Sequence, residues 1–129
     1  MTGWTDERPM SPHLQVWKWH WTMAASIFHR ASGVANYIGA ALIAAWLAAA
    51  ASGREMYNLV EDIIASAPGQ LVLFGFTVSV LYHLANGIRH LVWDGPGSGF
   101  NPSTASLVSV FNMAFGLFGA IALWALAWL

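Results

Sequence analysis

The feature that most limits how this chain can fold is the distribution of its charged residues. No charge occurs from Ala31 to Gly53, none from Ile63 to Ile88, and none from Thr104 to Leu129. A helix needs about 20 apolar residues to cross the roughly 30 Å hydrocarbon core of a bilayer. Each run is long enough, so the sequence predicts an all-α membrane protein with three transmembrane helices.

The overall composition agrees with lipid as the solvent. Of the 129 residues 57% are hydrophobic and 9% are charged, whereas soluble domains carry about 25% charged residues. The net charge of −1 gives no basic field that would attract nucleic acid. Cysteine is absent, which excludes disulfides, thiolate metal sites and cysteine-held iron–sulfur clusters. A metal or cofactor would have to be held by His, Met, carboxylate or backbone groups.

The chain divides into one membrane domain, 1–129, with an interfacial segment at 1–21 that ends in several tryptophans. Tryptophan prefers the headgroup level of a bilayer. The predicted spans are about 22–52, 70–93 and 104–129. Apolar residues at helical spacing after Arg54 predict a short amphipathic helix that lies on the membrane. Pro68-Gly69 is expected to break the chain before the second span.

The basic residues predict the orientation of the chain. Arg8, Lys18, Arg30 and Arg89 lie at one end of the spans, and only Arg54 lies at the other. Because cytoplasmic loops carry the excess of Lys and Arg, the N-terminus is expected to be cytoplasmic. The start of the chain has neither the basic-then-apolar pattern of a cleaved signal nor the composition of a transit peptide. We therefore expect a multi-pass protein of the bacterial inner membrane.

Polar residues cluster at the start of the first span, where ionisable groups are expensive and suggest function. Ser26 and Arg30 are four residues apart, so they share a helix face with their side chains adjacent. His29 lies between them in the sequence, and Ser32 follows Arg30 by two residues. A hydroxyl and a cation on one face could hold a polar ligand just below the cytoplasmic surface. An arginine that only anchors the helix end is equally compatible with this spacing.

A second cluster lies near the end of the second span and comprises Tyr82, His83, Asn86, Arg89 and His90. His83 and His90 are seven apart and share a face, and His83 lies about 9 Å along the axis from Arg89. A neutral imidazole at that depth needs a partner: a side chain of another helix, a proton path or a metal. In a membrane bundle without cysteine, haem iron is the leading metal. A hydrogen-bonded structural histidine remains an alternative.

One histidine does not complete a six-coordinate haem. His29 could be a second ligand from the same chain, but it is expected to lie at a different depth from His83. A partner subunit is therefore the other possible source of that ligand. Gly87, beside His83, would admit a flat cofactor.

Three motifs carry a resemblance to a known family. They are Arg8–Leu14 (RPMSPHL), Ser26–Gly33 (SIFHRASG) and His83–Asp94 (HLANGIRHLVWD). In order, spacing and three-span layout the chain resembles the cytochrome b membrane-anchor subunits of succinate dehydrogenase, respiratory complex II. The similarity covers essentially the whole chain, and the last two motifs are specific when they occur together.

The resemblance implies roles for residues in the matched motifs. It implies that His83 is an axial ligand of haem b, while the second axial histidine comes from a smaller second anchor subunit. It also implies that Ser26 and Arg30 line a ubiquinone site. His29 and Arg30 are expected near the haem propionates, and His90 is expected at the haem edge or in a structural role.

The implied assembly is a heteromeric helix bundle together with an iron–sulfur subunit and a flavoprotein, in which succinate oxidation supplies electrons to quinone. Three alternatives stay open on the sequence. One is a haem-free anchor that only docks soluble subunits, and another is the anchor of a quinol:fumarate reductase. The third is a small transporter or proton channel that uses Arg30, His83 and Arg89 along a path.

Overall fold

A computed structural model describes residues 17–127, which form four helices and no strand. The helices are α1 (Trp21–Ser52), α2 (Arg54–Ala65), α3 (Ala67–Asp94) and α4 (Pro102–Ala127). Three of them, α1, α3 and α4, are long and apolar enough to cross a membrane, so the predicted class of an all-α membrane protein with three spans is confirmed. The Arg8–Leu14 motif and most of the interfacial segment lie outside the described residues.

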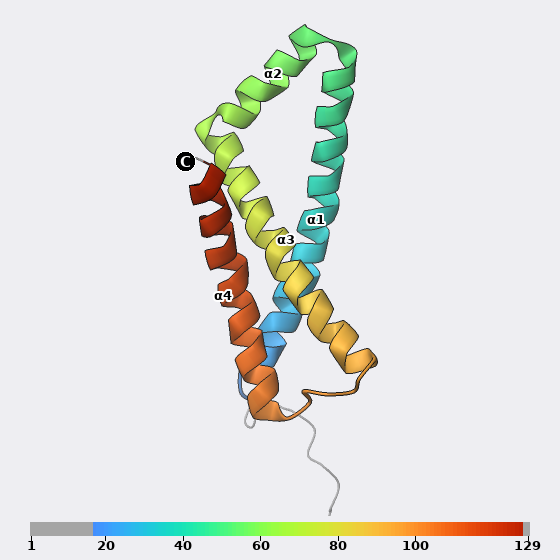
Figure 1. Ribbon diagram of the computed structural model, residues 1–129, viewed down its shortest axis with the longest axis vertical. Helices are drawn as coiled ribbons and strands as arrows, with labels where there is room; N and C mark the ends of the chain where they lie inside the picture. The colour runs from blue at the N-terminus through green and yellow to red at the C-terminus, as the bar shows by residue number, and fades with distance from the viewer. Residues whose placement is uncertain (1–16, 128–129) are drawn as a thin grey trace, which may run out of the picture.

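The three long helices are joined so that the start of α1 and the end of α4 lie at opposite ends of the molecule (Figure 1). Helix α4 runs beside α3, and α1 crosses α3 obliquely. The loop between α3 and α4 lies at the same end as the start of α1, whereas α2 bridges the other end. An α1 of 32 residues is about 48 Å long, so it can tilt and still cross the hydrocarbon core.

Helix α2 is the short amphipathic helix that the sequence predicts. It follows Gly53, whose φ of 113° is a backbone conformation that side chains rarely allow. None of its twelve residues is fully buried. Trp46 of α1 donates a hydrogen bond from Nε1 to Glu61 Oε1 at 3.0 Å. This bond ties α2 to the last turns of α1 at the end of the molecule that carries Arg54.

The start of α3 differs from the prediction. The break was expected at Pro68-Gly69, with the span beginning near Gln70, but the helix already begins at Ala67. The Ser66 side chain caps it by accepting a hydrogen bond from the Gly69 backbone N–H at 3.2 Å. Proline is tolerated in the first turn because its missing N–H would have no partner there. Pro68 therefore starts the helix and does not interrupt it.

Small side chains line the helix contacts. Gly116 of α4 lies against Tyr82 of α3 so closely that a Cβ there would be 2.8 Å from the Tyr82 Cβ. On α1, Gly39 packs against the Phe76 ring. The buried apolar residues are almost all alanines, while many large Leu, Ile, Val and Phe side chains are exposed. This arrangement is the reverse of a soluble core, and it suits helices that meet through small residues and face lipid or other helices.

Candidate functional site

Three histidines meet where α1 crosses α3. The His29 ring of α1 lies face to face with the His83 ring of α3, with centroids 4.2 Å apart and an interplanar angle of 29°. His90, two turns along α3, stacks on His29 with centroids 5.2 Å apart. We call His29, His83 and His90 the histidine stack. The expectation that His29 lies at a different depth from His83 is wrong, because the oblique crossing of α1 and α3 brings the two rings into contact.

The His83 ring is held by Ser32 of α1. The Ser32 hydroxyl lies 3.0 Å from His83 Nδ1 and donates to the His29 carbonyl oxygen at 2.8 Å. Among the described residues, Ser32 is the hydrogen-bond partner of the His83 ring. The sequence predicted that this imidazole needs a partner. At Nδ1 that partner is the Ser32 side chain of the neighbouring helix.

Two glycines shape the space around His83. A Cβ at Gly33 of α1 would lie 3.3 Å from His83 Cε1, so the backbone of α1 approaches the ring closely. A Cβ at Gly87, one turn along α3, would meet nothing within 4 Å. The ring is thus confined on the α1 side, while the surface of α3 next to it is open to a partner.

Ser26 and Arg30 lie on the strip of α1 that also carries Gly33. Ser26 is half-buried and Arg30 is exposed, so both remain accessible to a ligand. Positions four and three apart follow one another along a helix face, and Gly33 is the glycine next to the His83 ring. The strip with Ser26 and Arg30 therefore continues towards the side of the bundle where His83 lies.

A second polar cluster lies inside the bundle between α3 and α4. Asn86, only 1% exposed, accepts hydrogen bonds from Arg89 Nη1 at 3.2 Å and from Asn112 Nδ2 at 3.3 Å. Arg89 is also buried, and its guanidinium lies 4.0 Å from the centre of the Trp93 ring. That contact places the cation on an aromatic face, which is a favourable arrangement.

The sequence pattern indicated Asn86 without a role and Arg89 as part of a transporter path, and it did not indicate Asn112. The available signal was a single amide within a span that carries no charge, because polar residues inside a membrane are retained for a contact or a function. Asn86 is the residue through which Arg89 and Asn112 are connected. The cluster is a polar bond between two spans in a setting where apolar burial does little to join helices.

Asn86→Ala is expected to lower the stability of the bundle. The substitution leaves the buried donors of Arg89 and Asn112 without their acceptor, at a cost of about 1–3 kcal/mol. The measurement is the midpoint of thermal unfolding in detergent. Asn58→Ala, on the exposed surface of α2, is the matched control and should leave the midpoint unchanged. Equal midpoints for the two variants would show that the cluster contributes nothing to stability.

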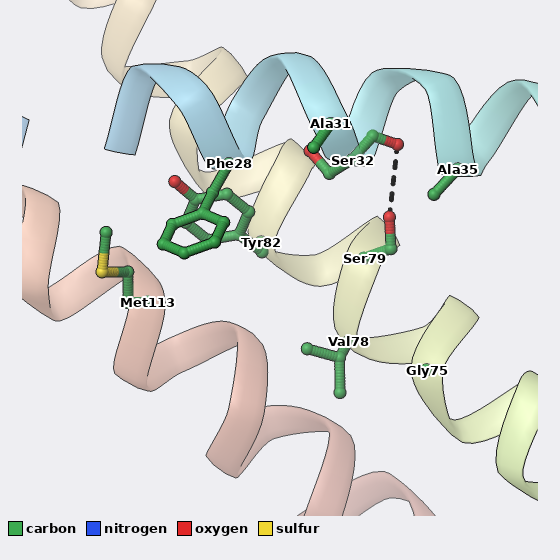
Figure 2. A pocket seen from close by; sticks show the side chains of 9 residues that line it. All are labelled: Phe28, Ala31, Ser32, Ala35, Gly75, Val78, Ser79, Tyr82 and Met113. Carbon is green, nitrogen blue, oxygen red and sulfur yellow. Dashed lines mark hydrogen bonds between the residues drawn. The ribbon is translucent and has the colours of Figure 1, made fainter. Parts of the chain in front are cut away.

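An apolar groove of about 370 Å³ is lined by residues of α1, α3 and α4, among them Ser32, which also contacts His83 (Figure 2). Its α1 residues include Phe28, Ala31 and Ala35, which lie on the opposite face of the helix from Ser26 and Arg30 by helical geometry. The Tyr82 hydroxyl at its wall donates to the Ala25 carbonyl at 2.8 Å. None of the histidine stack lines the groove.

A bare metal ion does not fit the described residues. They contain no group of three or more His, Cys, Asp or Glu side chains that could hold one. Two buried side-chain nitrogens, His29 Nε2 and Arg89 Nε, have no hydrogen-bond partner among these residues. Buried donors of this kind are usually paired, so the His29 nitrogen is a position where an external polar group is expected.

The fold and the site together define a three-span helical membrane protein that gathers histidines where two spans cross. The model of the succinate dehydrogenase/fumarate reductase transmembrane subunit family matches residues 5–123. The chain belongs to this family, and the resemblance given by its motifs is confirmed.

Individual relatives are named as cytochrome b subunits of succinate dehydrogenase. The chain is 31% identical over 119 residues to the succinate dehydrogenase cytochrome b556 subunit of Rickettsia prowazekii, covering 92% of each chain. It is 33% identical over 121 residues to the mitochondrial cytochrome b560 subunit of Mus musculus, covering 92% of this chain and 72% of the relative. The b556 subunit of Paracoccus denitrificans is 37% identical over 87 residues, 67% of each chain. These relatives support a membrane-anchor cytochrome role.

Proposed function

We propose that this chain binds haem b and ubiquinone as a membrane-anchor subunit of succinate dehydrogenase. The observation that carries the proposal is the histidine stack, with His83 held at one ring nitrogen by Ser32. Membership of the family and the cytochrome b names of its relatives support it.

His83 fits the role of axial haem ligand. Its ring is hydrogen-bonded at Nδ1, which leaves Nε2 for the iron, and the α3 surface at Gly87 is open. The buried and unpaired His29 Nε2 is suited to donate to a propionate. His90, stacked on His29, and Arg30 complete the proposed surroundings of the haem. When bound, haem b would supply a one-electron reservoir near the quinone.

The second axial ligand is proposed to come from another subunit. An imidazole would hold iron through a nitrogen lone pair in the plane of its ring. His29 and His83 lie face to face, which does not suit two ligands of one iron. A histidine of a second, smaller anchor subunit would fill the sixth position.

Ser26 and Arg30 are the proposed contacts to ubiquinone. Both are accessible on one strip of α1. Ser26 would donate a hydrogen bond to a quinone carbonyl and could pass it a proton. Arg30 would stabilise the negative charge that develops on a quinone oxygen during reduction, as a preorganised cation does in a site that excludes water.

The proposed partners are an iron–sulfur subunit, which brings electrons to the membrane surface, and a flavoprotein, which oxidises succinate. They would dock at the cytoplasmic end of the bundle, where α1 starts and the α3–α4 loop lies (Figure 1). Lys18, Arg30 and Arg89 belong to this end and Arg54 to the other, which supports a cytoplasmic N-terminus. The bacterial inner membrane is the proposed location.

Purification of the tagged chain from its own membranes in mild detergent tests the proposal. We expect the flavoprotein and the iron–sulfur subunit to co-purify, together with a succinate-reducible b-type absorption band and succinate-driven reduction of ubiquinone. An active complex without that band would show a haem-free anchor. A chain that purifies alone and moves ions across vesicles would instead be a transporter.

A further inference from the structure

We propose that Ser32 of α1 is a positioning residue for the haem ligand: its hydroxyl accepts the Nδ1 proton of His83 and so keeps Nε2 unprotonated and available to iron. The inference rests on the proposed function. It adds Ser32, which is neither the proposed haem ligand nor a proposed quinone contact. It also specifies which nitrogen of His83 binds the iron.

The proposed tautomer follows from the number of protons in the contact. The Ser32 hydroxyl has one proton, and it points to the His29 carbonyl oxygen at 2.8 Å. The hydroxyl oxygen then has only lone pairs to offer His83 Nδ1, which lies 3.0 Å away. With the hydroxyl proton placed in this way, Nδ1 is the donor. Because a neutral imidazole carries a single N–H, Nε2 has a free lone pair.

Ser32 is itself fixed from several directions. It is 8% exposed, so water competes little for its hydroxyl. Its backbone carbonyl accepts a hydrogen bond from Ser79 of α3 at 3.2 Å, and Ser79 also donates to Asn36 Oδ1 at 2.7 Å. These bonds hold the serine against α3 one turn before His83. Gly33, next along α1, confines the ring from the same side.

This arrangement is what a metal-bound histidine requires. Such histidines donate their second ring N–H to an acceptor, which fixes the tautomer and the ring orientation and raises the basicity of the ligand. Loss of the acceptor typically weakens metal binding by about 10- to 100-fold. A less basic ligand stabilises the ferric state less, so the reduction potential of the haem should rise. A tenfold change confined to the oxidised form corresponds to about 59 mV for a one-electron couple.

The test compares Ser32→Ala with two matched variants in the intact purified complex. Ser32→Thr keeps the hydroxyl. Ser79→Ala removes a serine hydroxyl that also bonds between α1 and α3 but does not touch His83. The readouts are the haem reduction potential, the low-spin ferric signal in electron paramagnetic resonance, and the rate of haem transfer to excess apomyoglobin.

We expect Ser32→Ala to raise the potential, to change the ferric signal and to speed haem loss by about 10- to 100-fold. Ser32→Thr should keep wild-type values, and Ser79→Ala, which loses a bond to the Ser32 backbone but keeps the Ser32 hydroxyl, should change them much less than Ser32→Ala. A Ser32→Ala complex with wild-type values would overturn the inference, as would equal changes in Ser32→Ala and Ser79→Ala, which would reflect helix packing. A wild-type complex without haem would overturn the proposed function as well, so the two failures are distinguishable.

Discussion

His83→Ala is expected to remove the b-type haem band from the purified complex. The substitution deletes the only ligand that this chain is proposed to give the iron, and His29, whose ring lies face to face with that of His83, is not placed to replace it. The measurement is the reduced-minus-oxidised visible spectrum, normalised to the amount of flavoprotein. Loss of the whole low-spin signal is the expected size of the effect.

The matched control for this variant is His20→Ala. His20 is exposed, precedes α1 and makes no capping hydrogen bond with its side chain. Its removal should leave the spectrum unchanged. If the band instead survives in His83→Ala, the ligand is another histidine, and the spectra of His29→Ala and His90→Ala identify which one.

Arg30→Ala is expected to lower succinate-driven ubiquinone reduction by about 10- to 100-fold, because a hydrogen bond to a charged group contributes about 1.5–3 kcal/mol. Oxidation of succinate with an artificial soluble acceptor should stay close to the wild-type rate, since that reaction does not use the quinone site. The two activities are measured on the same preparation.

Arg54→Ala is the control for charge. This arginine is also exposed but lies at the start of α2, at the opposite end of the bundle, so both activities should persist. Equal loss of the two activities in Arg30→Ala would mean that the arginine supports assembly of the complex, which would contradict its proposed role at the quinone.

The three spans could be predicted because a single physical quantity sets them. Bilayer thickness fixes the length of an uncharged apolar run, and charges at Arg54 and Arg89 mark where such runs end. The start of α3 was less predictable, since Pro68 suits both a turn and a first helical turn. The Ser66 cap decides between them, and it is visible only once the backbone is placed.

The site was predictable along each helix but not across helices. The spacing of Ser26 and Arg30, or of His83 and His90, follows from 3.6 residues per turn. The rotation and tilt of α1 against α3 do not, and they bring His29 onto His83 and Ser32 to its Nδ1. For the same reason the sequence did not reveal Asn112, which matters because it donates a hydrogen bond to Asn86 of the neighbouring span.

The outward direction of the large apolar side chains has a consequence for handling the protein. Lipid tails solvate those side chains about as well as another helix does, so the bundle gains little by excluding lipid. The three spans are held by close contacts at Gly116 and Gly39 and by a few polar bonds. Delipidation by harsh detergent should therefore loosen the spans well before any helix unwinds, and helicity by circular dichroism should outlast the arrangement that creates the histidine stack.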